Sequence, residues 1–159
     1  MKTKLFLFAS IAVFLTACKG EKGDTGPPGA QSNANVQSFT VTVESSSWIQ
    51  EPPVWKSNID VSAITQSIID HGTVSVFISY DGSRWWALPS SSVGAEFNYY
   101  FFIHNVEIIY SLSNGNTPNL PPPTSQFKIV TITGSIARDN PDIDWNNYSE
   151  IKANFNLTD

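Results

Sequence analysis

Hydrophobic and polar residues alternate along much of the chain beyond residue 36, as in β-strands with one buried face. In 37–44, Phe39, Val41 and Val43 share one parity and polar residues hold the other. The same alternation recurs in four further segments: 73–80, 84–89, 97–112 and 127–136. These segments predict a protein built mainly of antiparallel strands.

Turn residues and changes of phase divide these segments. Pro52-Pro53 splits 48–61 into two short strands around a bend, because proline cannot donate a hydrogen bond within a sheet. Asp81-Gly82 predicts a hairpin turn, with a return strand that ends at Pro89. Within 97–112 the alternation changes parity at Asn105-Val106, which predicts a bulge or a bend.

Two segments have helical rather than strand spacing. Ile64 and Ile68 lie one helical turn apart in 63–72, with Ser62 as the predicted N-cap and Gly72 as the residue that ends the helix. The segment 148–155 predicts a second short helix. We therefore predict an all-β fold, mainly an antiparallel sandwich or a small barrel, with one or two short helices.

The N-terminus has the pattern of an export signal. Lys2 and Lys4 precede an apolar stretch at 5–15, which is shorter than a membrane-spanning helix needs. The segment ends Leu15-Thr16-Ala17-Cys18, similar to the bacterial lipobox. We expect residues 1–17 to be a cleaved lipoprotein signal peptide, and Cys18 to carry a diacylglycerol together with acyl chains such as palmitate.

The next segment predicts a tether. Gly20, Gly23 and Gly26 begin three Gly-X-Y triplets, the repeat of collagen. Three triplets provide too few contacts to offset the conformational entropy lost when three chains order into a triple helix. We therefore expect a flexible spacer over 18–35 and a monomer rather than a trimer. The β-rich globular domain then comprises residues 36–159.

Composition limits the classes of partner. Without Lys2 and Lys4, seven basic residues remain against fourteen acidic ones, which argues against nucleic acid as a partner. Cys18 is the only cysteine, so the chain forms no internal disulfide and no cysteine-based metal site.

Few residues are candidates for catalysis or metal binding. The two histidines are His71, at a predicted helix end, and His104, on a predicted strand. No Gly-x-Ser-x-Gly or His-Glu-x-x-His motif is present. Asp142 and Asp144 lie in an oxygen-rich loop with the alternation of a calcium site, but the loop lacks the glycine and the final glutamate of an EF-hand. We expect no catalytic residue, no metal and no cofactor.

Trp85 and Trp86 are the candidate ligand-binding residues. Adjacent residues of a strand face opposite sides, so one indole is expected to enter the core and the other to be exposed. An exposed indole offers a flat surface on which a sugar ring can stack.

The whole chain resembles a group of Bacteroidota lipoproteins of unknown function. The resemblance lies in the lipobox, the Gly-X-Y stretch and three segments of the domain: 63–76, 85–89 and 147–155. It implies a lipid-anchored protein of the cell envelope, at the periplasmic or surface face of the outer membrane. We expect a non-enzymatic binding or structural module whose partner is a glycan or an envelope protein. The alternative is a hydrolase that acts on an envelope or extracellular polymer.

Overall fold

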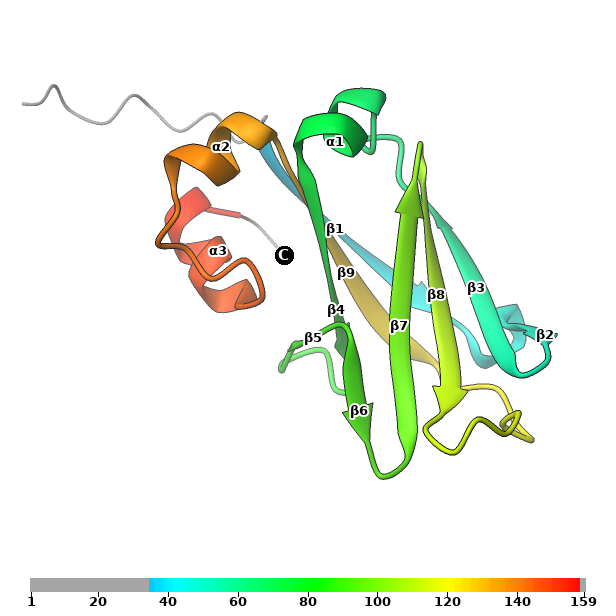
Figure 1. Ribbon diagram of the computed structural model, residues 1–159. Helices are drawn as coiled ribbons and strands as arrows, with labels where there is room; N and C mark the ends of the chain where they lie inside the picture. The colour runs from blue at the N-terminus through cyan, green and yellow to red at the C-terminus, as the bar shows by residue number, and fades with distance from the viewer. Residues whose placement is uncertain (1–34, 158–159) are drawn as a thin grey trace, which may run out of the picture.

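The protein is a β-sandwich of two antiparallel sheets with short helices on one side (Figure 1). The computed structural model describes residues 35–157. The first sheet has four strands in the order β1 (Val36–Val43), β9 (Ser125–Ile132), β4 (Thr73–Ser79) and β5 (Trp86–Ala87). The second has five in the order β2 (Ile49–Glu51), β3 (Val54–Asp60), β8 (Asn105–Leu112), β7 (Ala95–Phe102) and β6 (Ser90–Ser92). The predicted fold class is confirmed, in its sandwich form.

The main core lies between the two sheets. The inward parity of β1 that the alternation predicts is confirmed, because Phe39, Val41 and Val43 all contact this core. Trp48 lies deep within it, with its ring 6.2 Å from the rings of both Phe97 and Phe127. Burial of this apolar surface is the main source of stability in a domain without disulfides.

A second core covers the opposite face of the first sheet. Two short helices pack there, α2 (Gly134–Asp139) and α3 (Tyr148–Phe155), and α1 (Gln66–His71) leads into β4 (Figure 1). Phe77 and Val130 point to this side and contact Tyr148 and Ile151 of α3. The central strands β4 and β9 are consequently buried on both faces, so the molecule has three layers.

Several local predictions are confirmed. The segment 48–61 forms two strands on either side of Pro52-Pro53, and α3 covers the predicted residues 148–155. The single strand predicted for 97–112, with a bulge or bend at Asn105-Val106, is wrong: β7 and β8 form a hairpin whose last pair is Phe102 with Asn105, and the chain reverses at Ile103-His104. Reversal of the chain explains the change of parity, because each strand presents its own inward set of side chains.

Two predicted strands have different bounds. The strand predicted for 127–136 ends at Ile132, and Ile136 belongs to α2, where it contacts the helix-side core. The predicted return strand over 84–89 pairs with β4 only at Trp86 and Ala87, because the chain then crosses to the second sheet.

Gly72 ends α1 as predicted, but the reason for glycine at this position is a tertiary contact rather than a local one. Its φ of −98° is ordinary, so no left-handed conformation requires glycine. A Cβ atom there would lie 2.5 Å from the backbone oxygen of Ile132. Glycine is needed because α1 approaches the end of β9 closely.

The two ends of the sandwich differ in what they carry. At the end where β1 begins, Val36 lies opposite Ile132, and the β7–β8 turn lies beside the segment leading to α1 (Figure 1). At the other end β4 stops at Ser79 and the chain passes to β5 and β6. The predicted signal peptide, Cys18 and residues 18–34 of the predicted tether lie outside the described residues. Within residues 35–157, no helix is long and apolar enough to cross a membrane.

Candidate functional site

An exposed aromatic pair marks the end of the sandwich that is remote from Val36. Tyr80 follows β4 and Trp86 begins β5, and their ring centres are 5.8 Å apart with the planes inclined at 49°. Tyr80 is 55% and Trp86 is 40% exposed, so both rings offer part of their surface to a ligand. The guanidinium of Arg84 lies 5.5 Å from the centre of the Trp86 ring and restricts that indole.

The loop between these aromatic residues is organised by Asp81. Its Oδ1 accepts hydrogen bonds from the backbone N–H groups of Arg84 and Ser83, and its Oδ2 accepts one from Nε of Arg84. These bonds, the backbone bond from Arg84 foremost, hold the pKa of the Asp81 carboxyl far below its ordinary value of 3.8. Gly82 adopts a φ of 73° beside it, as a tight turn requires. Asp81 therefore has a structural role, and its charge is balanced locally.

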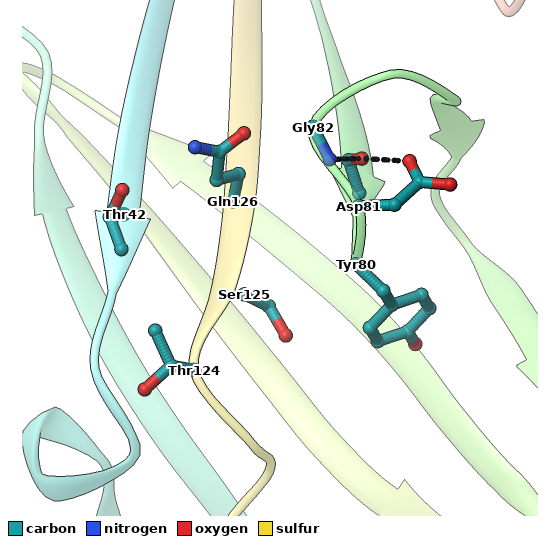
Figure 2. Close-up of a pocket in the computed structure, with 8 residues that line it drawn as sticks. Thr42, Tyr80, Asp81, Gly82, Thr124, Ser125 and Gln126 are labelled. Atoms are coloured by element: carbon teal, nitrogen blue, oxygen red, sulfur yellow. Dashed lines mark hydrogen bonds between the residues drawn. The ribbon is translucent and has the colours of Figure 1, made fainter.

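Three pockets lie at this end of the sandwich, and two of them are lined by a residue of the aromatic pair. A pocket of about 280 Å³ lies between Tyr80, Trp86 and the hydroxyl-bearing strand β6 (Ser90–Ser92). Another, of about 270 Å³, shares Tyr80 and extends over the ends of β1 and β9 to Thr42 and Gln126 (Figure 2).

The third pocket extends in the other direction along the second sheet. It has a volume of about 310 Å³, shares Ser90 and Ser91, and reaches Glu96 and Asn98 of β7. We call these three pockets together the aromatic groove. Its walls combine two aromatic rings with hydroxyl and amide groups, and Glu96 is the carboxylate at its far end.

Tyr80 is held as a neutral phenol inside this groove. Burial of its hydroxyl, together with the nearby phenol of Tyr110, raises its pKa above the ordinary value of 10. Like any phenol, the Tyr80 hydroxyl can both donate and accept a hydrogen bond at neutral pH.

The structure separates the two candidate tryptophans. Trp86 lines the aromatic groove, whereas Trp85 points to the helix side of the first sheet, 6.0 Å from the ring of Tyr148. One indole is packed and one exposed, as the alternation predicts. Trp85 contributes to the helix-side core and does not line the groove.

The other tryptophans do not join this site. Trp48 is in the main core, Trp55 donates a hydrogen bond to the backbone oxygen of Pro118 at 2.8 Å, and Trp145 stacks on Phe155. The groove thus depends on Trp86 together with Tyr80, which the sequence pattern had placed only as a strand residue.

The histidines and acidic residues that a hydrolase would use are dispersed. His104 is exposed in the β7–β8 turn, at the opposite end of β7 from Glu96. Glu107 lies 3.6 Å from the ammonium of Lys56, and Asp144 accepts a hydrogen bond from the backbone of Asn146. None of the three pockets of the groove is lined by a histidine.

Asp142 and Asp144, the candidate metal ligands, lie in the loop before α3. Both are exposed, and Asp144 and Glu150 help to define the turn into the helix, with Glu150 Oε1 accepting from the Asp144 N–H. Among residues 35–157, no group of three His, Cys, Asp or Glu side chains is placed to hold a metal ion.

Comparison with protein-family models, with curated proteins and with solved structures finds no match to this chain.

Sequence reasoning missed the serines of β6 as part of the site. Ser90, Ser91 and Ser92 form a strand without a hydrophobic residue, so the alternation gave no signal there. The available signal was their position: three hydroxyls follow a tryptophan-containing hairpin and precede Gly94, a turn residue.

Proposed function

We propose that this protein is a lipid-anchored envelope module that binds glycans without hydrolysing them, and that the aromatic groove is its binding site. The exposed pair of Tyr80 and Trp86, set between hydroxyl-bearing walls, is the observation that carries the proposal. Anchoring through Cys18, with residues 18–35 as the tether, is the second part of the proposal and is supported by the lipobox.

The chemistry of the groove suits a sugar. An aromatic ring has a negative face, which attracts the weakly positive C–H groups on the face of a pyranose ring. Sugar hydroxyls lie around the edge of that ring and need hydrogen-bond partners. Ser90, Ser91 and Gln126 supply such partners on the two sides of the aromatic pair. A small number of polar groups around an apolar surface is the usual composition of a ligand site.

The pocket between Tyr80, Trp86 and β6 is the primary place for a sugar ring in this proposal. The other two pockets lie on different faces of the sandwich: Gln126 is on the helix side of the first sheet, and Asn98 is on the outer face of the second. We expect a hexasaccharide to bind at least as tightly as its disaccharide, since a longer chain can extend past this pocket.

The alternative function, hydrolysis of a polymer, has less support from the groove. Glycoside hydrolysis generally uses two carboxyl groups on either side of the scissile bond. Asp81 already accepts hydrogen bonds from its own loop, and Glu96 lies at the far end of the groove. This arrangement favours a binding role.

Binding can be tested on the full chain carrying Cys18→Ala, which removes the proposed lipid and its anchor. Cellohexaose, maltohexaose and N-acetylchitohexaose would be titrated by calorimetry, each beside its disaccharide. We expect one hexasaccharide to bind, and Trp86→Ala to lower its affinity about tenfold or more, corresponding to ~1.4 kcal/mol. Phe102→Ala, which removes an exposed aromatic side chain at the far end of β7, is the matched control and should bind like wild type.

Three results would contradict the proposal. Full affinity in a folded Trp86→Ala variant would place the binding site elsewhere, and failure of every probe to bind would remove the glycan as ligand. Release of new reducing ends from a bound probe would instead establish the hydrolase.

A further inference from the structure

Three exposed apolar side chains gather at the turn between β7 and β8. Tyr100 and Phe102 lie on the outer face of the second sheet and are 63% and 48% exposed, and Ile103 in the turn is 49% exposed. We call these three residues the apolar tip. Clusters of exposed apolar residues commonly mark a contact with another molecule or with a membrane.

The backbone of the apolar tip is held in place by the rest of the domain. The N–H of His104 donates to the backbone oxygen of Ile64 at 2.8 Å, and the oxygen of His104 accepts from the N–H of Val61 at 2.8 Å. These bonds tie the turn to the segment that leads into α1. A surface already ordered in this way loses little conformational entropy when it docks.

The apolar tip lies at the end of the sandwich where the chain enters the domain. β1 begins there at Val36, whereas the aromatic groove lies at the opposite end (Figure 1). Seventeen residues, 18–34, join Cys18 to the described domain, and an extended chain of that length spans at most roughly 60 Å. A lipid on Cys18 would therefore hold the domain within that distance of the bilayer, and Val36, where the tether joins the domain, lies at the same end as the apolar tip.

The charges around the apolar tip suit an uncharged lipid surface. Its three side chains are neutral, and Glu107, the nearest acid on the outer face of β8, is paired with Lys56. Asp60 faces Asn105 across the sheet and adds a negative charge nearby, so binding to anionic lipid is disfavoured. Zwitterionic headgroups carry no net charge and leave apolar contact as the driving force.

We propose that the apolar tip rests in the headgroup and upper acyl region of the bilayer that holds the Cys18 lipid, so that the aromatic groove faces away from the membrane. This inference rests on the anchoring part of the proposed function. Three side chains bind a bilayer only weakly by themselves. Tethering raises their local concentration to roughly the millimolar range, which makes a weak contact populated. Tyr100 suits this interface because its ring is apolar and its hydroxyl is polar.

The test uses the mature lipidated chain, residues 18–159, in phosphatidylethanolamine–phosphatidylcholine vesicles. Cys18 is the only cysteine and its thiol is consumed by the lipid, so an introduced cysteine is the single labelling site. An environment-sensitive fluorophore would be placed on Ile103→Cys or, as the matched control, on Val93→Cys. Val93 is also apolar and exposed, but it lies in the β6–β7 turn at the groove end.

We expect nitroxide-labelled lipid to quench the probe at Ile103 several times more strongly than the probe at Val93. Adding Phe102→Ser should reduce the quenching at Ile103 without changing circular dichroism. Equal quenching at the two positions would overturn the docking.

The mass of the mature chain shows whether Cys18 is lipidated, and so distinguishes failure of membrane docking from failure of the anchoring proposal. If the mature chain carries the lipid on Cys18 and the Ile103 probe stays unquenched, docking is wrong and anchoring stands. If the chain carries no lipid, the anchoring proposal itself fails. A concentration-dependent spectral shift at Ile103 in the lipid-free Cys18→Ala chain would show that a second copy covers the tip, which would also overturn the proposal.

Discussion

The ammonium nitrogen of Lys128 lies 4.0 Å from the centre of the Tyr148 ring, in the interior of the protein. Lys128 is only 1% exposed and occupies the middle of β9, and the indole of Trp85 lies 4.3 Å from the same nitrogen. Two aromatic faces thus surround a buried cation where β9, β5 and α3 meet. The contact joins the first sheet to the helix layer.

Lys128 and Trp85 should be energetically coupled, because a desolvated ammonium loses an aromatic partner when the indole is removed. Lys128→Met and Trp85→Leu would be made singly and together in the Cys18→Ala chain and unfolded with urea. We expect a coupling free energy of about 1–2 kcal/mol from the double-mutant cycle. Cavity and transfer effects of each single change cancel in the cycle. Additive losses of stability would show that the indole packs without stabilising the charge.

Asp81 should make stability depend on pH in the acid range. Because the folded state lowers its pKa, the carboxyl stays ionised in the folded protein at a pH where the unfolded chain already binds a proton. The Asp81 contribution is therefore present in full well above its ordinary value of 3.8 and is lost as the pH falls below it. Asp81→Asn should lower the thermal midpoint at pH 7, and its difference from wild type should narrow toward about pH 2.

Arg84→Met provides the matched control for Asp81. It removes the guanidinium but leaves the backbone N–H groups of Ser83 and Arg84 that bind Oδ1. We expect the thermal midpoint of Arg84→Met to depend on pH more weakly than that of wild type and more strongly than that of Asp81→Asn. A constant difference between wild type and Asp81→Asn across the whole pH range would contradict the role given to the Asp81 charge.

The β6–β7 turn contains a strained residue. Val93 has a φ of 49° and Gly94 a φ of 80°, and the two residues connect the pair Ser92–Ala95. Positive φ at both positions is the type I′ geometry, which favours Asn-Gly and disfavours a β-branched side chain. Val93→Asn should stabilise the domain by about 1 kcal/mol and raise Tm by roughly 3–5 °C. Val93 is fully exposed, so little packing is lost.

Calorimetric melting of the Cys18→Ala chain would measure this gain. Val93→Ile keeps β-branching and the strain, and it should melt like wild type. An equal rise in Tm for Val93→Asn and Val93→Ile would show that the stabilisation does not come from relief of backbone strain.

Local patterns predicted those elements that local physics controls. Alternation identified β1 and β4, and two prolines marked the bend between β2 and β3. The helix at Tyr148–Phe155 follows from its i,i+4 apolar pair and from Asn147, whose side chain caps Glu150. Each of these signals lies within a few residues of the structure that it specifies.

Other features depend on contacts between distant segments. The β6 serines form a strand only because β7 pairs with them, and β9 ends at Ile132 because the chain there turns into α2. Lys128 shares the parity of Val130 and Ile132, but a lysine gives no local sign that it is buried. Its burial depends on α3, which comes twenty residues later in the chain.

Alternation along the chain was enough to determine that Trp85 and Trp86 face opposite sides of a strand, because adjacent side chains in a strand always do. Which indole would pack against the helices was decided by the tertiary structure. Tyr148 and Lys128 cover the side of Trp85, whereas the chain leaves the first sheet after Ala87 and crosses to β6, so that Trp86 remains beside Tyr80 in an open groove. Periodicity determines the direction of a side chain relative to its neighbours; only the packing of distant elements determines what lies in that direction.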